Sequence, residues 1–175
     1  MSKGGRRAIV LIKAKTIQLH TAEKVQLFDL TNEVKGFLAE SGVWNGMGVV
    51  STLHTTTGVF FTEVQDALWD DVNVFLRQLV AERAGYKHND PRFSDCDRQN
   101  AAAHLRSILL GGSLALQVED GRLVLGQFQR IVFAELDGPR PRSLRMQFMG
   151  AGAALELPEW EKKDSLQLPT NGGLR

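Results

Sequence analysis

The chain has little cysteine, almost no net charge and no long apolar run, and each shortage excludes a class of protein. Cys96 is the only cysteine among 175 residues, so no internal disulfide can form, and we expect a reducing, cytoplasmic location. The 21 Lys and Arg residues balance 20 Asp and Glu residues, which leaves no field of one sign to attract nucleic acid or an anionic membrane. The longest apolar stretches, such as AIVLI, are far shorter than the roughly 20 residues that span a bilayer.

What the chain does contain are strand and helix patterns without regular βαβ spacing, which predict an α+β fold with mainly antiparallel sheet. Its length suits one globular domain over residues 1–150, with 151–175 as a peripheral tail. The expected helices begin at Thr31 as the cap, at 66 (ending at 83) and at 101 (ending at 110). A tight turn at Asp120-Gly121 is expected within a hairpin over 113–126. The remaining strands are expected over 8–19, 24–30 as its antiparallel partner, 47–55, 58–63, 130–138 and 143–150.

Three histidines stand at positions where side chains from different elements can meet. His54 ends an expected strand in HTTTGVFFTE, His88 lies in the long polar loop 84–100, and His104 lies one turn into the next helix. Three neutral imidazoles that leave one coordination position open are the pattern of catalytic zinc. Taken singly, each is more often a hydrogen-bonded structural group. Both interpretations stay open.

Hydroxyl, carboxylate and guanidinium groups surround these histidines in the sequence. Glu63 is a candidate base or orienter of the imidazole rings, and the threonines beside His54 are candidate phosphate donors. Two arginines separated by a proline can bind phosphate bidentately, although arginines in a turn are more often a solvated face. The candidates for substrate binding are Thr55, Thr56, Ser113 (in the turn after the third helix), Arg140 and Arg142.

The segments HTTTGVFFTE, YKHND and NAAAHLRSILLGGSLALQVEDGRLVLGQFQRIVFAELDGPRPRSLRMQFMG resemble the YjbQ family, which is described as secondary thiamine-phosphate synthases. The resemblance covers about residues 10 to 150. It implies a compact α+β domain with antiparallel sheets packed against helices on one side, assembled as a homotrimer. It also implies that His54, His88 and His104 gather around an anion or a divalent metal such as zinc or magnesium.

Two positions depart from the family pattern. The family commonly has GTWQ where this chain has GQFQ, so Phe128 keeps an aromatic ring without an indole N–H, while Gln129 is retained as a candidate substrate-binding residue. Many members also have a histidine at the position of Ala102. That change removes a fourth ligand or base.

Three functions follow as expectations. The first, implied by the resemblance, is transfer of an aminopyrimidine methyl group from diphosphate to the nitrogen of a phosphorylated thiazole, with His54, Glu63 and Arg140 as catalytic residues. The second is a metal-dependent hydrolase with Glu63 as general base. The third is a ligand-binding or assembly protein that turns nothing over. In all three a small phosphorylated molecule is the expected ligand class.

Overall fold

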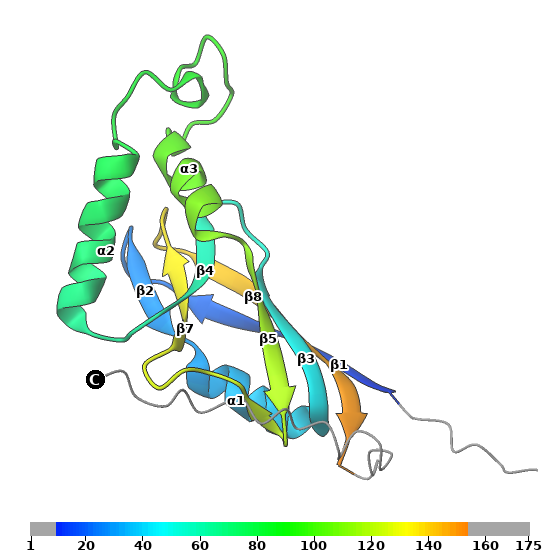
Figure 1. Ribbon diagram of the computed structural model, residues 1–175. Coiled ribbons are helices and arrows are strands. Elements are labelled where there is room, and N and C mark those ends of the chain that lie inside the picture. The colour runs from blue at the N-terminus through cyan, green and yellow to red at the C-terminus, as the bar shows by residue number, and fades with distance from the viewer. Residues whose placement is uncertain (1–9, 154–175) are drawn as a thin grey trace, which may run out of the picture.

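The computed structural model describes residues 10–153, which fold into two antiparallel sheets and three α-helices (Figure 1). The α+β fold with mainly antiparallel sheet is therefore confirmed. Residues 154–175, and with them most of the expected tail, lie outside the described part. The elements in chain order are β1 (Val10–His20), β2 (Gln26–Asp29), α1 (Thr31–Ser41), β3 (Val43–Thr52), β4 (Thr57–Thr62), α2 (Asp66–Leu79), a short 3-10 turn (Lys87–Asn89), α3 (Ala101–Leu110), β5 (Ser113–Glu119), β6 (Arg122–Leu123), β7 (Arg130–Glu135) and β8 (Pro141–Gly152).

The larger sheet has the strand order β1-β8-β3-β5-β6, and it corrects one expected pairing. β1 pairs with β8, from Val10 opposite Ala151 to His20 opposite Pro141, and not with β2. Alternation shows which residues share a face of a strand but not which strand lies beside it. β1 and β8 are the two longest strands, with 11 and 12 residues. The first and last strands of the described chain therefore pair along almost their whole length.

The smaller sheet, β2-β7-β4, places the most buried strand of the protein in its centre. Every residue of β7 from Ile131 to Glu135 is buried. One face of this sheet joins the larger sheet and α1 in the main core, where Phe133, Phe148 and Val34 are fully covered. The other face lies under α2 and α3, through Leu76 and Ala103. Because β7 is buried on both faces, the charged residue at its end, Glu135, is buried as well.

The helix boundaries differ from expectation at two points, and a hydrogen bond from a distant segment is present at each. Leu30, not Thr31, is the N-cap of α1, because the Thr31 hydroxyl accepts a hydrogen bond from the Ile131 backbone at 2.9 Å. Helix α2 ends at Leu79 instead of 83, since Val80 is extended and its carbonyl accepts a hydrogen bond from Arg106 at 2.7 Å. Long-range contacts, which periodicity does not contain, set both ends.

The expected turn at Asp120-Gly121 is confirmed. Asp120 has φ 48° and Gly121 has φ 69°, the pair of left-handed angles that a tight two-residue hairpin turn requires. The hairpin partner β6 is short, because the chain leaves the sheet after Leu123. None of the described helices is long and apolar enough to cross a membrane.

Candidate functional site

A cavity of about 330 Å³ opens where three connections meet beside the central strand. The β3–β4 connection supplies the first stretch of its wall, the start of α3 supplies the second, and the β7–β8 turn supplies the third. The lining residues are Leu53, His54, Thr55, Thr56, Asn100, His104, Arg140 and Arg142. We call this cavity the arginine–histidine pocket. Sequence segments nearly 90 residues apart therefore contribute to one site, which none of them could form alone.

Arg142 is held at the base of the pocket by a buried carboxylate. Its guanidinium makes a two-pronged ion pair with Glu135, and the side chains are 2% and 0% exposed. Glu135 also accepts hydrogen bonds from the backbone N–H groups of Leu136 and Asp137 at 2.9 and 2.8 Å. Arg142 donates in addition to the hydroxyl of Thr56 at 2.9 Å. These contacts use the N–H groups of Nε and Nη2, so the planar guanidinium presents its two remaining N–H groups, both on Nη1, in a fixed direction.

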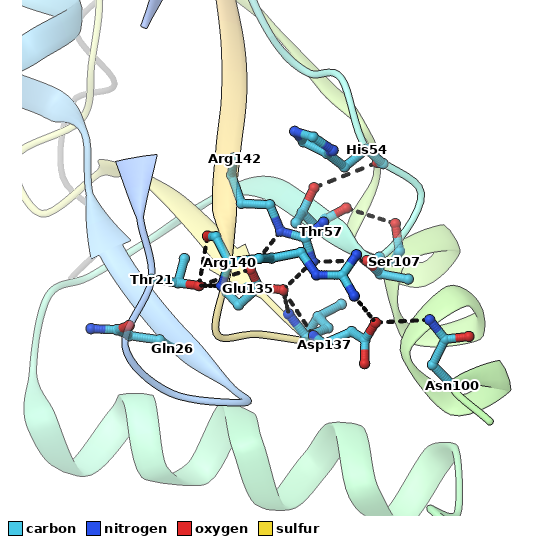
Figure 2. A network of polar contacts seen from close by, with 12 residues as sticks. Thr21, Gln26, His54, Thr57, Asn100, Ser107, Glu135, Asp137, Arg140 and Arg142 are labelled. Carbon is cyan, nitrogen blue, oxygen red and sulfur yellow. Dashed lines mark hydrogen bonds and ion pairs between the residues drawn. The ribbon is translucent and has the colours of Figure 1, made fainter. Parts of the chain in front are cut away.

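Asp137 orients the second arginine and ties the long loop to the pocket. Its Oδ2 accepts hydrogen bonds from Asn100 at 2.8 Å and from Arg140 at 3.1 Å (Figure 2). The same oxygen accepts one from Arg98 at 2.8 Å. The carboxylate is almost fully buried, whereas the Arg140 side chain is 29% exposed. Asp137 therefore holds the end of the 84–100 loop and one wall of the pocket in a single charge-assisted cluster.

His54 is oriented by a backbone hydrogen bond. Its Nε2 accepts a hydrogen bond from the backbone N–H of Ser143 at 2.7 Å, so the proton of the neutral ring is on Nδ1. Burial, and then the positive charge of Arg142, lower the pKa of His54, while Glu135 opposes the shift. In this state the ring is a hydrogen-bond donor through Nδ1. Its Nε2 can bind a metal only by giving up the Ser143 contact.

His104 and His88 form a pair at the other side of the pocket. Their ring centroids are 5.0 Å apart in an edge-to-face arrangement, and the Nε2 of His88 lies 3.2 Å from the amide oxygen of Asn100. Burial and the neighbouring His88 lower the pKa of His104, while the Thr55 backbone and Asp137 oppose the shift. His104 lines the pocket, whereas His88 contacts His104 without lining it. In residues 10–153 no group of three or more His, Cys, Asp or Glu side chains is arranged to hold a metal ion.

Three candidates from the sequence do not line the pocket. Glu63 follows the far end of β4, six residues after Thr57, which corresponds to roughly 20 Å of extended chain. Ser113 begins β5 as an exposed residue. Gln129 accepts a hydrogen bond from the backbone of Gly126 at 3.1 Å within its own turn. The structure thus brings together His54, Thr55, Thr56, His104, Arg140 and Arg142, with His88 as a neighbour.

Four residues that orient the site were not anticipated from the sequence: Arg98, Asn100, Glu135 and Asp137. A signal for two of them is present in ELDGPRPR, where two carboxylates precede two arginines at the same two-residue spacing. In extended segments that spacing puts each pair of side chains on one face. The pattern therefore indicates paired charges.

Comparison with known proteins gives a consistent result. The chain matches the family model "UPF0047 protein YjbQ-like" over residues 15–151. It is 38% identical to a UPF0047 protein of Methanothermobacter thermautotrophicus (79% of this chain, 93% of the relative) and 36% identical to UPF0047 protein YugU of Bacillus subtilis (78% and 98%). Its fold resembles a protein of unknown function from Sulfolobus solfataricus, with TM-score 0.76, 29% identity and coverage of 81% and 99%. It also resembles an uncharacterised protein of Clostridium acetobutylicum, with TM-score 0.69, 33% identity and coverage of 77% and 98%. The chain belongs to the YjbQ/UPF0047 family.

Proposed function

We propose that the arginine–histidine pocket binds the phosphate group of a small molecule and that the protein is a transferase of the thiamine-phosphate synthase kind. One observation carries the proposal: Arg140 and Arg142 open into one cavity with two histidines, and each arginine is oriented by a buried carboxylate. Guanidinium groups held in this way match phosphate oxygens in geometry as well as in charge. The cavity, at about 330 Å³, is within the range of small-molecule sites.

The proposed reaction requires stabilisation of the departing diphosphate. The carbon–oxygen bond to diphosphate breaks, its electron pair leaves with the diphosphate, and the lone pair of the thiazole nitrogen forms the new carbon–nitrogen bond. Negative charge grows on the diphosphate as the bond breaks, so fixed donors stabilise the transition state more than the ground state. Arg140, Arg142 and the Nδ1–H of His54 supply such donors without a protein nucleophile.

The charges around the pocket favour an anion. Arg140 and Arg142 contribute two positive charges, Glu135 and Asp137 contribute two negative ones, and Arg98 adds a further positive charge at Asp137. Arg140 and Arg142 line the cavity, whereas Glu135 and Asp137 do not. A phosphate therefore meets cations first.

A divalent metal, zinc or magnesium, on His54, His88 and His104 stays a prediction. The hydrogen bond from the Ser143 backbone to His54 favours the anion site over the three-histidine metal site. A metal bound to Nε2 of His54 would break this partly buried hydrogen bond. Elemental analysis of the purified protein tests it. About one equivalent of metal, lost in the His54→Ala and His104→Ala variants, would favour the metal site and with it the hydrolase alternative.

The proposed function is tested by calorimetric titration with pyrophosphate and by assay of the transfer reaction itself. We expect pyrophosphate to bind, and Arg140→Gln to weaken binding by about tenfold, the effect of one lost charge-assisted contact. Arg145→Gln is the matched control, because Arg145 lies on β8, five residues after Arg140, with its guanidinium on Thr16 and outside the lining of the pocket. Equal affinity in both variants would contradict the phosphate site. Binding without turnover would support the non-catalytic alternative.

A further inference from the structure

A groove that the arginine–histidine pocket does not use runs between helix α2 and strand β2. It consists of two neighbouring cavities of about 400 and 290 Å³, both of which touch Glu23 and Val25. In Figure 1, α2 runs alongside β2 at the side of the smaller sheet. The α2 wall is formed by side chains at helical spacing along one face of the helix: Asp66, Trp69, Asp70, Asn73 and Arg77. We call this feature the α2–β2 groove.

One wall of the groove is a free strand edge. β2 is the outer strand of the order β2-β7-β4. The backbone N–H of Leu30 donates to Ile131 at 2.8 Å, and the alternation of an antiparallel ladder then points the backbone groups of Val25 and Leu27 away from β7. In the described part of the chain, no backbone hydrogen bond from another segment reaches these two residues. An exposed edge of this kind is a template for a further strand.

The two ends of the groove carry opposite charge. Three cations, Lys24, Arg77 and Arg106, line one end together with two carboxylates. Of these carboxylates, Glu82 bonds Lys24 and, at 3.0 Å, Arg106, and Glu23 touches both cavities. Asp66 and Asp70 line the other end. Because Lys24 precedes β2 and Arg77 ends the α2 wall, the cationic end lies at the start of β2. An extended segment antiparallel to β2 would place its own C-terminus at this cationic end.

The buried side-chain polar atoms that lack a partner within residues 10–153 lie at the same groove. In residues 10–153, two buried side-chain polar atoms have no hydrogen-bond partner, Oδ1 of Asn73 and Nε of Arg106. Asn73 lines one cavity and Arg106, which is 3% exposed, lines the other. Buried polar groups in native proteins nearly always have partners, so each exception calls for an explanation. A bound segment with N–H and carboxylate groups offers one.

We propose that the α2–β2 groove binds the C-terminal segment of a partner protein as an added strand antiparallel to β2. The terminal carboxylate is received by Arg77 beside Lys24 and Arg106, and a basic residue near the other end is received by Asp66 and Asp70. From Asp66 to Arg77 the helix wall is about 16 Å long at 1.5 Å per residue, which matches roughly five extended residues. Backbone pairing supplies affinity in such complexes, and the pockets for alternate side chains supply specificity.

The test uses the full chain and two fluorescein-labelled pentapeptides with a free C-terminal carboxylate, Lys-Thr-Val-Thr-Val and Lys-Thr-Phe-Thr-Leu. We expect at least one of them to bind by fluorescence anisotropy, and its C-terminal amide to bind about tenfold more weakly, as for a lost charge-assisted contact. Arg77→Glu should weaken the free acid similarly. Arg122→Glu, on β6 of the other sheet, is the charge-matched control and should change nothing. Both positions are exposed, so both variants should fold.

A charge exchange and a map of the contact complete the test. Asp70→Lys should weaken the Lys-first peptide and favour the same peptide beginning with Glu. In amide NMR spectra, the shifts on binding should lie at Val25, Leu27 and Trp69. Equal affinities for free acid and amide, no binding of either peptide, or shifts confined to the arginine–histidine pocket would overturn the proposal. So would a change in oligomeric mass for Arg77→Glu, since a second copy would then be the occupant.

Discussion

Glu135 and Arg142 form an ion pair at the base of the arginine–histidine pocket, and each charge allows the other to be buried. Glu135 accepts from two backbone N–H groups and from Arg142, so its charge is distributed over several donors. A carboxylate buried without those donors would carry a desolvation cost of several kcal/mol. The ion pair is therefore a condition for placing a guanidinium at the base of a pocket.

Removing one partner of this pair should be far worse than removing both. Arg142→Met leaves Glu135 as an uncompensated buried charge, and we expect the free energy of unfolding to fall by about 3–5 kcal/mol. In the double variant Glu135→Met with Arg142→Met, the loss should be smaller than in the single one. Urea denaturation followed by circular dichroism measures both. The single variant Glu135→Met completes the comparison. If the loss in the double variant equals the sum of the losses in the two single variants, the pair is not coupled.

His54 links the same site to pH. Its pKa in the folded protein is lowered, first by burial and then by Arg142, so the unfolded chain binds a proton more readily below its ordinary pKa of 6.5. The contribution of His54 to stability is therefore complete above pH 6.5 and is lost as the pH falls below that value. His54→Gln should make the free energy of unfolding less dependent on pH below about 6.5, where the unfolded chain takes up a proton on this ring and the folded chain does not. NMR titration of the His54 ring to a pKa above 6.5 would contradict this.

At the scale of elements, two glycines differ in whether the backbone requires them. Gly121 has a conformation that other residues rarely adopt, whereas Gly36 lies in a helix that any residue but proline could continue. Gly121 has φ 69°, and a Cβ placed there would lie 3.0 Å from the Trp44 ring. Gly36 lies within α1, where a Cβ would have nothing within 4 Å. The same substitution should consequently have opposite effects at the two positions.

Gly121→Ala should lower the free energy of unfolding by about 1–2 kcal/mol, because the left-handed conformation is unfavourable for a residue with a Cβ. Gly36→Ala should raise it by roughly 0.5–1 kcal/mol, since alanine loses less conformational entropy in a helix. Chemical denaturation of the two variants side by side checks both signs. A stabilising Gly121→Ala would mean that the hairpin turn differs in solution.

For the whole molecule, exposed apolar side chains point to assembly. Met47 and Val49 on β3 and Met149 on β8 share one outward face, with Met47 opposite Met149 in register. Ile108 and Leu109 on α3 are 76% and 55% exposed. Large exposed apolar patches on soluble domains mark interaction sites. They support the homotrimer that the family resemblance implies.

We expect light scattering to give about 58 kDa, three times the 19.4 kDa of one chain. Ile108→Asp should shift the mass toward 19.4 kDa, because a carboxylate would be desolvated in an apolar interface. Lys13→Asp, at an exposed position of β1, is a control for added negative charge. A wild-type mass of one chain at micromolar concentration would exclude the trimer.

The sequence by itself determined the class of fold and most of its elements. Periodicity located α1, α2 and α3, and Asp120-Gly121 located a turn, because these features depend on neighbours a few residues apart. It also named the histidines, threonines and arginines that line the pocket. The tertiary structure alone decided that β1 pairs with β8, that Glu63 lies far from the pocket, and that Glu135 and Asp137 orient the two arginines. The physical reason is that strand partners and buried ion pairs depend on contacts between residues distant in the chain, whereas propensity and spacing record only what is near.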